Sequence, residues 1–76
     1  MGHRVTVGLM PGADWRPVEN ALHAAGAESV RSPAPELPDV LIVTIPNDRD
    51  IEEFVRRARA LPGVRYAERD AWQFSL

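Results

Sequence analysis

A chain of 76 residues has room for one domain with one hydrophobic core. It contains no cysteine, which excludes disulfides and thiolate metal sites, and its two histidines, His3 and His23, lack the spacing of a ligand pair. The net charge is −2 and all nine basic residues are arginine, so the basic surplus of a nucleic-acid-binding module is missing. No apolar run approaches the roughly 20 residues that cross a membrane. We therefore expect no metal, no cofactor, no nucleic acid and no membrane, and stability from packing alone or from packing plus a partner.

The first third of the chain predicts a strand followed by a helix. Residues 4–10 alternate apolar and polar side chains, which is typical of a strand with one buried face. Asp14 can cap the helix that follows, and Gly26 can end it in a left-handed turn. One apolar stripe of helical spacing joins the two ends: Trp15, Val18, Leu22 and Ala25.

The middle of the chain predicts a weak strand, a loop and a strong strand. Residues 27–31 suit a short strand. Residues 32–38 contain three prolines, which cannot donate to a sheet ladder, so we expect a loop there. Residues 40–45 place apolar side chains on both faces of the predicted strand, and Pro46 ends this strand.

The last third predicts a second helix and a final strand. Asn47 or Asp48 is expected to cap the helix, and Pro62 with Gly63 to end it. The apolar stripe consists of Ile51, Phe54, Val55, Ala58 and Leu61. Residues 64–68 are expected to form the last strand, followed by a tail.

Charges along the second helix favour a solvated surface over a ligand site. Glu52 and Arg56, like Glu53 and Arg57, stand four residues apart, the spacing of ion pairs on a helix. Together with Arg59, these arginines could form an anion site. The simpler interpretation is a solvated helix end, in which the arginines balance the charge of the acids one turn earlier.

The element order is strand, helix, strand, strand, helix, strand. The compact solution for that order is an α+β, ferredoxin-like βαββαβ fold: a four-stranded antiparallel sheet with two helices on one face. We expect a single domain over residues 1–76, with residues 1–3 and 71–76 as flexible ends.

The sequence offers no catalytic constellation. Ser29, Ser32 and Ser75 have no histidine near them in sequence, and His23 lies in the middle of a predicted helix among alanines. The glycines are scattered beside turns and do not form a phosphate-binding loop. We therefore expect a binding protein and not an enzyme.

The strand over residues 40–45 predicts an exposed apolar surface. Two helices cover only one face of a four-stranded sheet, so one set of alternating side chains on this strand must point outward. One set is Val40, Ile42 and Thr44, and the other is Leu41, Val43 and Ile45. An outward apolar face indicates a docking surface for a partner, self-association, or simple tolerance of scattered apolar residues.

The tail alternates large side chains at Trp72, Phe74 and Leu76. This pattern suits an extended segment added to the edge of a partner's sheet. It equally suits an extension of the chain's own last strand.

The segment over residues 61–70 resembles the end of subtilisin propeptides and of the stand-alone inhibitors related to them. It joins a helix end to a Tyr66–Asp70 stretch of the form Tyr-x-Glu-x-Asp, and six residues follow Asp70, as in that family. The order of elements extends the resemblance over essentially the whole chain.

The resemblance implies a mode of binding to a subtilisin-like serine protease. In that family the open sheet face packs on two surface helices of the protease, and two acidic residues cap the helix N-termini. By position these acids are Glu68 and Asp70 here. The tail then lies in the active-site cleft as a product-like strand, with Leu76 in the main specificity pocket. The residues expected in the cleft are Gln73, Phe74, Ser75 and Leu76.

The implied function is inhibition of a subtilisin-like protease, either as a separate chain or as a propeptide that also assists folding of the attached enzyme. The alternative is a ferredoxin-like regulatory domain that associates weakly with itself through its outward sheet face. If the 76 residues are the complete chain, the lack of a signal peptide predicts a cytoplasmic protein. If they are an excised propeptide, we expect a secreted one.

Overall fold

The computed structural model describes residues 2–69 and contains four strands and two helices in the predicted order. Their bounds are β1 His3–Leu9, α1 Trp15–Ala24, β2 Ser29–Arg31, β3 Val40–Ile45, α2 Ile51–Arg59 and β4 Val64–Arg69. The βαββαβ order confirms the predicted α+β fold. Neither helix of this part of the chain is long and apolar enough to span a membrane.

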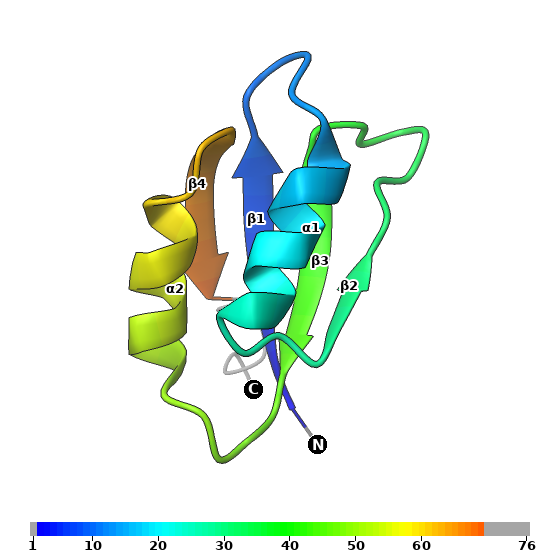
Figure 1. Cartoon of the computed structure of the whole chain (residues 1–76). Helices are drawn as coiled ribbons and strands as arrows, with labels where there is room; N and C mark the ends of the chain where they lie inside the picture. The colour runs from blue at the N-terminus through cyan, green and yellow to red at the C-terminus, as the bar shows by residue number, and fades with distance from the viewer. Residues whose placement is uncertain (1, 70–76) are drawn as a thin grey trace.

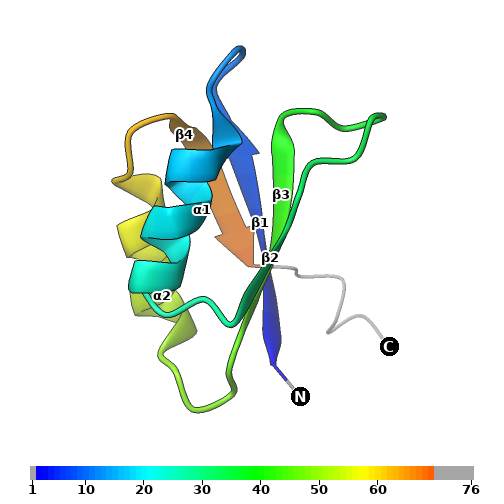
Figure 2. The ribbon, with the colours of Figure 1, turned by 45° about the vertical axis from the view of Figure 1, so that its right-hand side comes forward.

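The four strands form one antiparallel sheet in the order β2-β3-β1-β4 (Figure 1). The two long central strands, β1 and β3, pair with each other, while β2 and β4 form the edges. Both helices lie on the same side of the sheet, as Figure 2 shows, and they cross over it between consecutive strands. The opposite side of the sheet is covered by neither helix.

Helix α1 begins and ends where the sequence predicts. Asp14 is its N-cap, and its carboxylate accepts a hydrogen bond of 3.0 Å from the backbone N–H of Arg16. Gly26 follows the helix at φ 121°, a backbone conformation that favours glycine. The stripe residues Val18 and Leu22 are buried against the sheet.

Helix α2 begins later than predicted, because Asp50 and neither Asn47 nor Asp48 is its N-cap. The Asp50 carboxylate accepts from the backbone N–H groups of Glu52, at 3.0 Å, and Glu53, at 3.2 Å. The physical reason is a turn directly after β3, in which the N–H of Arg49 donates to the carbonyl of Pro46. That turn contains the two residues expected to cap the helix, so the helix starts beyond them.

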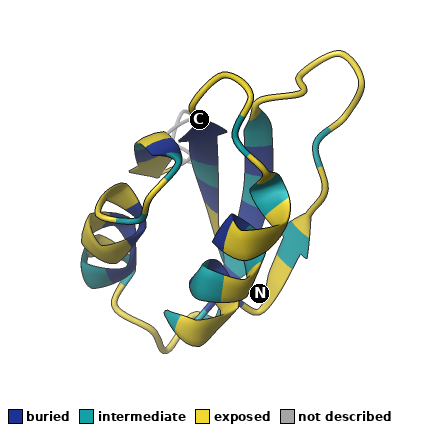
Figure 3. Cartoon of the chain, turned by 45° about the horizontal axis from the view of Figure 1, so that its top comes forward, coloured by how far each residue is buried: buried dark blue, intermediate teal, exposed yellow. Residues whose placement is uncertain are grey.

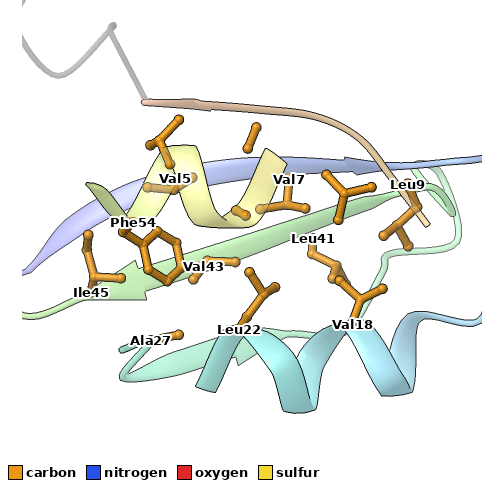
Figure 4. Close-up of a cluster of buried hydrophobic side chains, with 14 residues drawn as sticks. Val5, Val7, Leu9, Val18, Leu22, Ala27, Leu41, Val43, Ile45 and Phe54 are labelled. Atoms are coloured by element: carbon orange, nitrogen blue, oxygen red, sulfur yellow. The ribbon is translucent and has the colours of Figure 1, made fainter. Parts of the chain in front are cut away.

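The core fills the space between the sheet and the helices. Figure 3 shows the buried residues on the strands and on the inner sides of both helices, with exposed residues on the outer sides and in the loops. Side chains from α1 meet side chains from the central strands in Figure 4. The core residues are Val5, Val7, Leu9, Val18, Leu22, Ala27, Leu41, Val43, Ile45, Phe54, Val55, Ala58, Val64 and Ala67.

The burial of β3 decides which of its two faces points outward. Leu41, Val43 and Ile45 are fully buried under the helices. The alternate set is only partly buried on the other side of the sheet: Val40, Ile42 and Thr44. The predicted outward apolar surface therefore exists.

Candidate protein-interaction surface

The side of the sheet that faces away from the helices is here called the open face. Residues paired across antiparallel strands place their side chains on the same face, so the register defines three rows across the sheet. The first row is Ser29, Thr44 and Arg4; the second is Arg31, Ile42, Thr6 and Glu68; the third is Val40, Gly8 and Tyr66.

The open face is hollowed in its middle. A depression of about 640 Å³ lies over the central strands and extends to the loop before β3. The residues that line it are Arg4, Thr6, Ser29, Arg31, Leu37, Val40, Ile42, Thr44 and Tyr66. Leu37, which is 57% exposed, adds an apolar side chain at the loop end. The floor is thus aliphatic, threonine hydroxyls are interspersed, and arginines stand at its border.

Tyr66 covers the one position of the open face that has no side chain. Gly8 is paired with Tyr66, and a Cβ at Gly8 would lie 2.0 Å from Cε2 of the ring. The ring therefore lies against the backbone of β1 at Gly8. Glycine in a strand interior often marks such a close approach, and an aromatic neighbour recovers part of the packing that glycine lacks.

Glu68 stands at the border of the open face, at the opposite end of the second row from Arg31. It is exposed, lies one residue before the end of β4 and is paired with Thr6. The structure thus places one of the two predicted helix-capping acids on the face expected to contact a partner. The other acid, Asp70, and the four predicted tail residues lie outside the described residues: Gln73, Phe74, Ser75 and Leu76.

Two arginines fasten β4 to α2 on the other side of the sheet. Arg69 donates from Nη1 to Oε2 of Glu52 at 2.5 Å, and Arg59 donates from Nε to the carbonyl of Ala67 at 3.0 Å. Sequence reasoning missed both contacts, because they join residues 17 and 8 positions apart. They hold the strand that leads to the tail in a defined place.

One of the two ion pairs predicted on α2 is present in the structure. Glu53 and Arg57 form the expected ion pair at 3.3 Å. Within residues 2–69, Glu52 pairs with Arg69 and not with Arg56, because the end of β4 comes next to the first turn of α2. Acidic residues in that first turn and arginines in the last also complement the helix dipole.

The side chain of His23 contacts residues near it in sequence. Its Nδ1 lies 3.2 Å from the carbonyl oxygen of Ala27, and its Nε2 lies 3.7 Å from Oε2 of Glu19 on the preceding turn. The ring therefore bridges the end of α1 and the chain leading to β2. In the described part of the chain, no three histidine, aspartate or glutamate side chains gather where they could hold a metal ion.

The comparison with protein families agrees with this architecture. Residues 4–70 match the family model described as the fervidolysin N-terminal prodomain. The chain belongs to this prodomain family. It is a family of subtilisin-type propeptides, so the resemblance predicted from the sequence is confirmed. No curated protein and no solved structure gives a significant match.

The prodomain match covers both predicted acids but not the tail. Glu68 and Asp70 lie inside the matched range, while residues 71–76 follow it. The assignment of roles to the acids and to the tail therefore stays a prediction. The flexibility expected for residues 1–3 and 71–76 also stays a prediction. Strand β1 already begins at His3, which pairs with Ile45.

Proposed function

We propose that this prodomain binds the catalytic domain of a subtilisin-type serine protease and blocks its active site. It does so either in cis, as a propeptide that also assists folding of the attached enzyme, or in trans, as an inhibitor. One observation carries the proposal: a chain of the fervidolysin prodomain family leaves one side of its sheet uncovered by helices, with an apolar floor and a carboxylate at its border.

The open face supplies the docking surface. Its partly buried aliphatic and aromatic side chains lose water when a protein surface covers them, which favours association. Glu68 and Asp70 meet the N-termini of two helices of the protease. Free backbone N–H groups and the positive end of the helix dipole attract a carboxylate at such a position.

The tail supplies the inhibition. Residues 73–76 run through the active-site cleft as an extended strand, and Leu76 fills the main specificity pocket. Main-chain hydrogen bonds to the edge of the cleft give affinity, and the alternating side chains give selectivity. Gln73 departs from the apolar side chain usual at its subsite, which favours a protease with a more polar subsite than that of subtilisin.

Binding to a partner also suits the energetics of so small a domain. The core has no disulfide to reinforce it, and the described residues contain no group of side chains that could hold a metal ion. A partner that binds only the folded form adds stability by mass action, about 2.7 kcal/mol when its free concentration is a hundred times Kd. Folding of the prodomain and docking on the protease are therefore expected to be coupled.

The proposal is tested by titrating the chain into subtilisin and into a panel of other subtilisin-type proteases, with a chromogenic peptide as substrate. The full chain is compared with a chain that lacks residues 74–76. We expect inhibition to fall at least a hundredfold on truncation, while the midpoint of urea unfolding changes little. Equal loss of inhibition and stability, or no inhibition of any protease in the panel, would overturn the proposal.

A further inference from the structure

The middle row of the open face carries opposite charges at its two ends. Arg31 on the edge strand β2 is followed across the sheet by Ile42 and Thr6, and Glu68 on the other edge strand ends the row. Arg31 and Glu68 are both exposed, while Ile42 and Thr6 are partly buried between them. The row is therefore basic at one edge of the sheet, acidic at the other and apolar near its centre.

Such a row is complementary to itself under one two-fold rotation. When two open faces meet about an axis parallel to the strands, Arg31 of one copy comes opposite Glu68 of the other, and Ile42 comes opposite Thr6. An axis across the strands would place Arg31 against Arg31 and Glu68 against Glu68. A two-fold interface uses the same patch on both copies, and like charges set opposite each other are unfavourable, so the charges select the first arrangement.

The neighbouring rows are compatible with that arrangement. In the third row, Val40 comes opposite Gly8, whose backbone is covered by the ring of Tyr66, so an aliphatic side chain meets an aromatic ring. In the first row, Thr44 comes opposite Arg4, a neutral hydroxyl against a cation. No pair of like charges faces directly across the interface among these rows.

We propose that the free chain forms a two-fold dimer through its open face, with a second copy occupying the surface on which a protease would dock. This goes beyond the proposed function, because it predicts that self-association competes with binding of the protease. Four strands about 4.8 Å apart give a face roughly 19 Å wide, and a six-residue strand is roughly 20 Å long, so each copy buries roughly 400 Å², about half of a standard interface side. The dimer is accordingly weak and reversible, with a dissociation constant on the order of 0.1–1 mM.

Sedimentation equilibrium of the full chain tests the charge pairing without any protease. R31E and E68R each set like charges opposite one another twice per dimer, and we expect each to weaken association about tenfold. The double variant R31E/E68R exchanges the two charges at unchanged net charge, and it should restore association to within about threefold of the parent. R56E, on the exposed side of α2, is the matched control and should leave association unchanged.

Cross-linking tests the geometry. The chain has no cysteine, so a short bismaleimide joins only introduced thiols. A mixture of R31C and E68C should give heterodimers in at least fivefold higher yield than either variant alone, because position 31 faces position 68 and not itself. Circular dichroism of every variant checks that it remains folded.

Three results would overturn the inference: a chain that is monomeric at 1 mM, a double variant no better than the single ones, or R31C cross-linking alone as well as in the mixture. None of them bears on inhibition of a protease. Failure of the titration described above would instead overturn the proposed function and leave the dimer standing.

Discussion

The ring of Tyr66 rests on the backbone of Gly8, in the space where any other residue at position 8 would place its Cβ. Tyr66 belongs to β4, and Gly8 to the central strand β1. The contact therefore places the aromatic ring directly over the central strand on the open face. It also shows why a strand that otherwise alternates valine and polar side chains contains a glycine.

Gly8→Ala should displace this ring and destabilise the domain. The new methyl group would lie 2.0 Å from Cε2, so the ring must move, and we expect a loss of about 1–3 kcal/mol in the free energy of unfolding. Urea denaturation followed by circular dichroism measures it. In a Tyr66→Ala background the same substitution should cost under about 1 kcal/mol, because the clash is gone. An equal cost in both backgrounds would contradict the account.

Asp50→Ala should lower the free energy of unfolding by about 1 kcal/mol, because Asp50 caps two backbone N–H groups at the start of α2. Asp48→Ala is the matched control, since Asp48 is a carboxylate two residues earlier that lies in the preceding turn. It should change the unfolding free energy by less than about 0.5 kcal/mol. Thermal and urea unfolding of the two variants distinguish the residues, and a larger effect at position 48 would show that the cap is misassigned.

The elements could be predicted from the sequence wherever local chemistry alone decides them. Alternation in β1, the Asp14 cap and the Gly26 turn each act within a few residues, and the structure contains all three. The cap of α2 could not be predicted in the same way. Asn47, Asp48 and Asp50 are all good capping residues, and only the turn after Pro46 selects the last of them.

The candidate surface was predictable in kind but not in detail. The apolar character of β3 on both faces indicates an uncovered side, yet periodicity alone does not tell which set of side chains points outward. The charged ends of the row through Ile42 depend on the register of four strands, and the Glu52–Arg69 contact depends on how α2 packs against β4. Such pairings are tertiary and leave no mark in local sequence.

Arg59→Ala should loosen β4 from α2. The Arg59 guanidinium donates to the carbonyl of Ala67 on the edge strand β4, and loss of that bond should cost about 1 kcal/mol of unfolding free energy. Hydrogen exchange should accelerate more in residues 64–69 than in β1 or β3. Arg56→Ala, one turn earlier on the exposed side of α2, is the control and should leave both quantities unchanged. Uniform acceleration over the whole sheet would contradict a local role for Arg59.

Glu68→Gln should weaken inhibition without weakening the fold. Glu68 is exposed on β4, so the substitution should change the free energy of unfolding by less than about 0.5 kcal/mol. If its carboxylate meets the N-terminus of a protease helix, loss of the charge should raise the inhibition constant roughly threefold to thirtyfold at low ionic strength. Added salt should shrink this difference, because screening weakens the interaction of a charge with a helix dipole.

Asp48→Asn controls for the change in net charge, since Asp48 is also an exposed acid and lies in the turn between β3 and α2, outside the three rows of the open face. It should leave the inhibition constant within about twofold of the parent, because long-range attraction by one surface charge is largely screened beyond roughly 10 Å at 0.1 M salt. Equal weakening by both variants would mean that overall charge steers the encounter. In that case Glu68 would have no specific place in the docking surface.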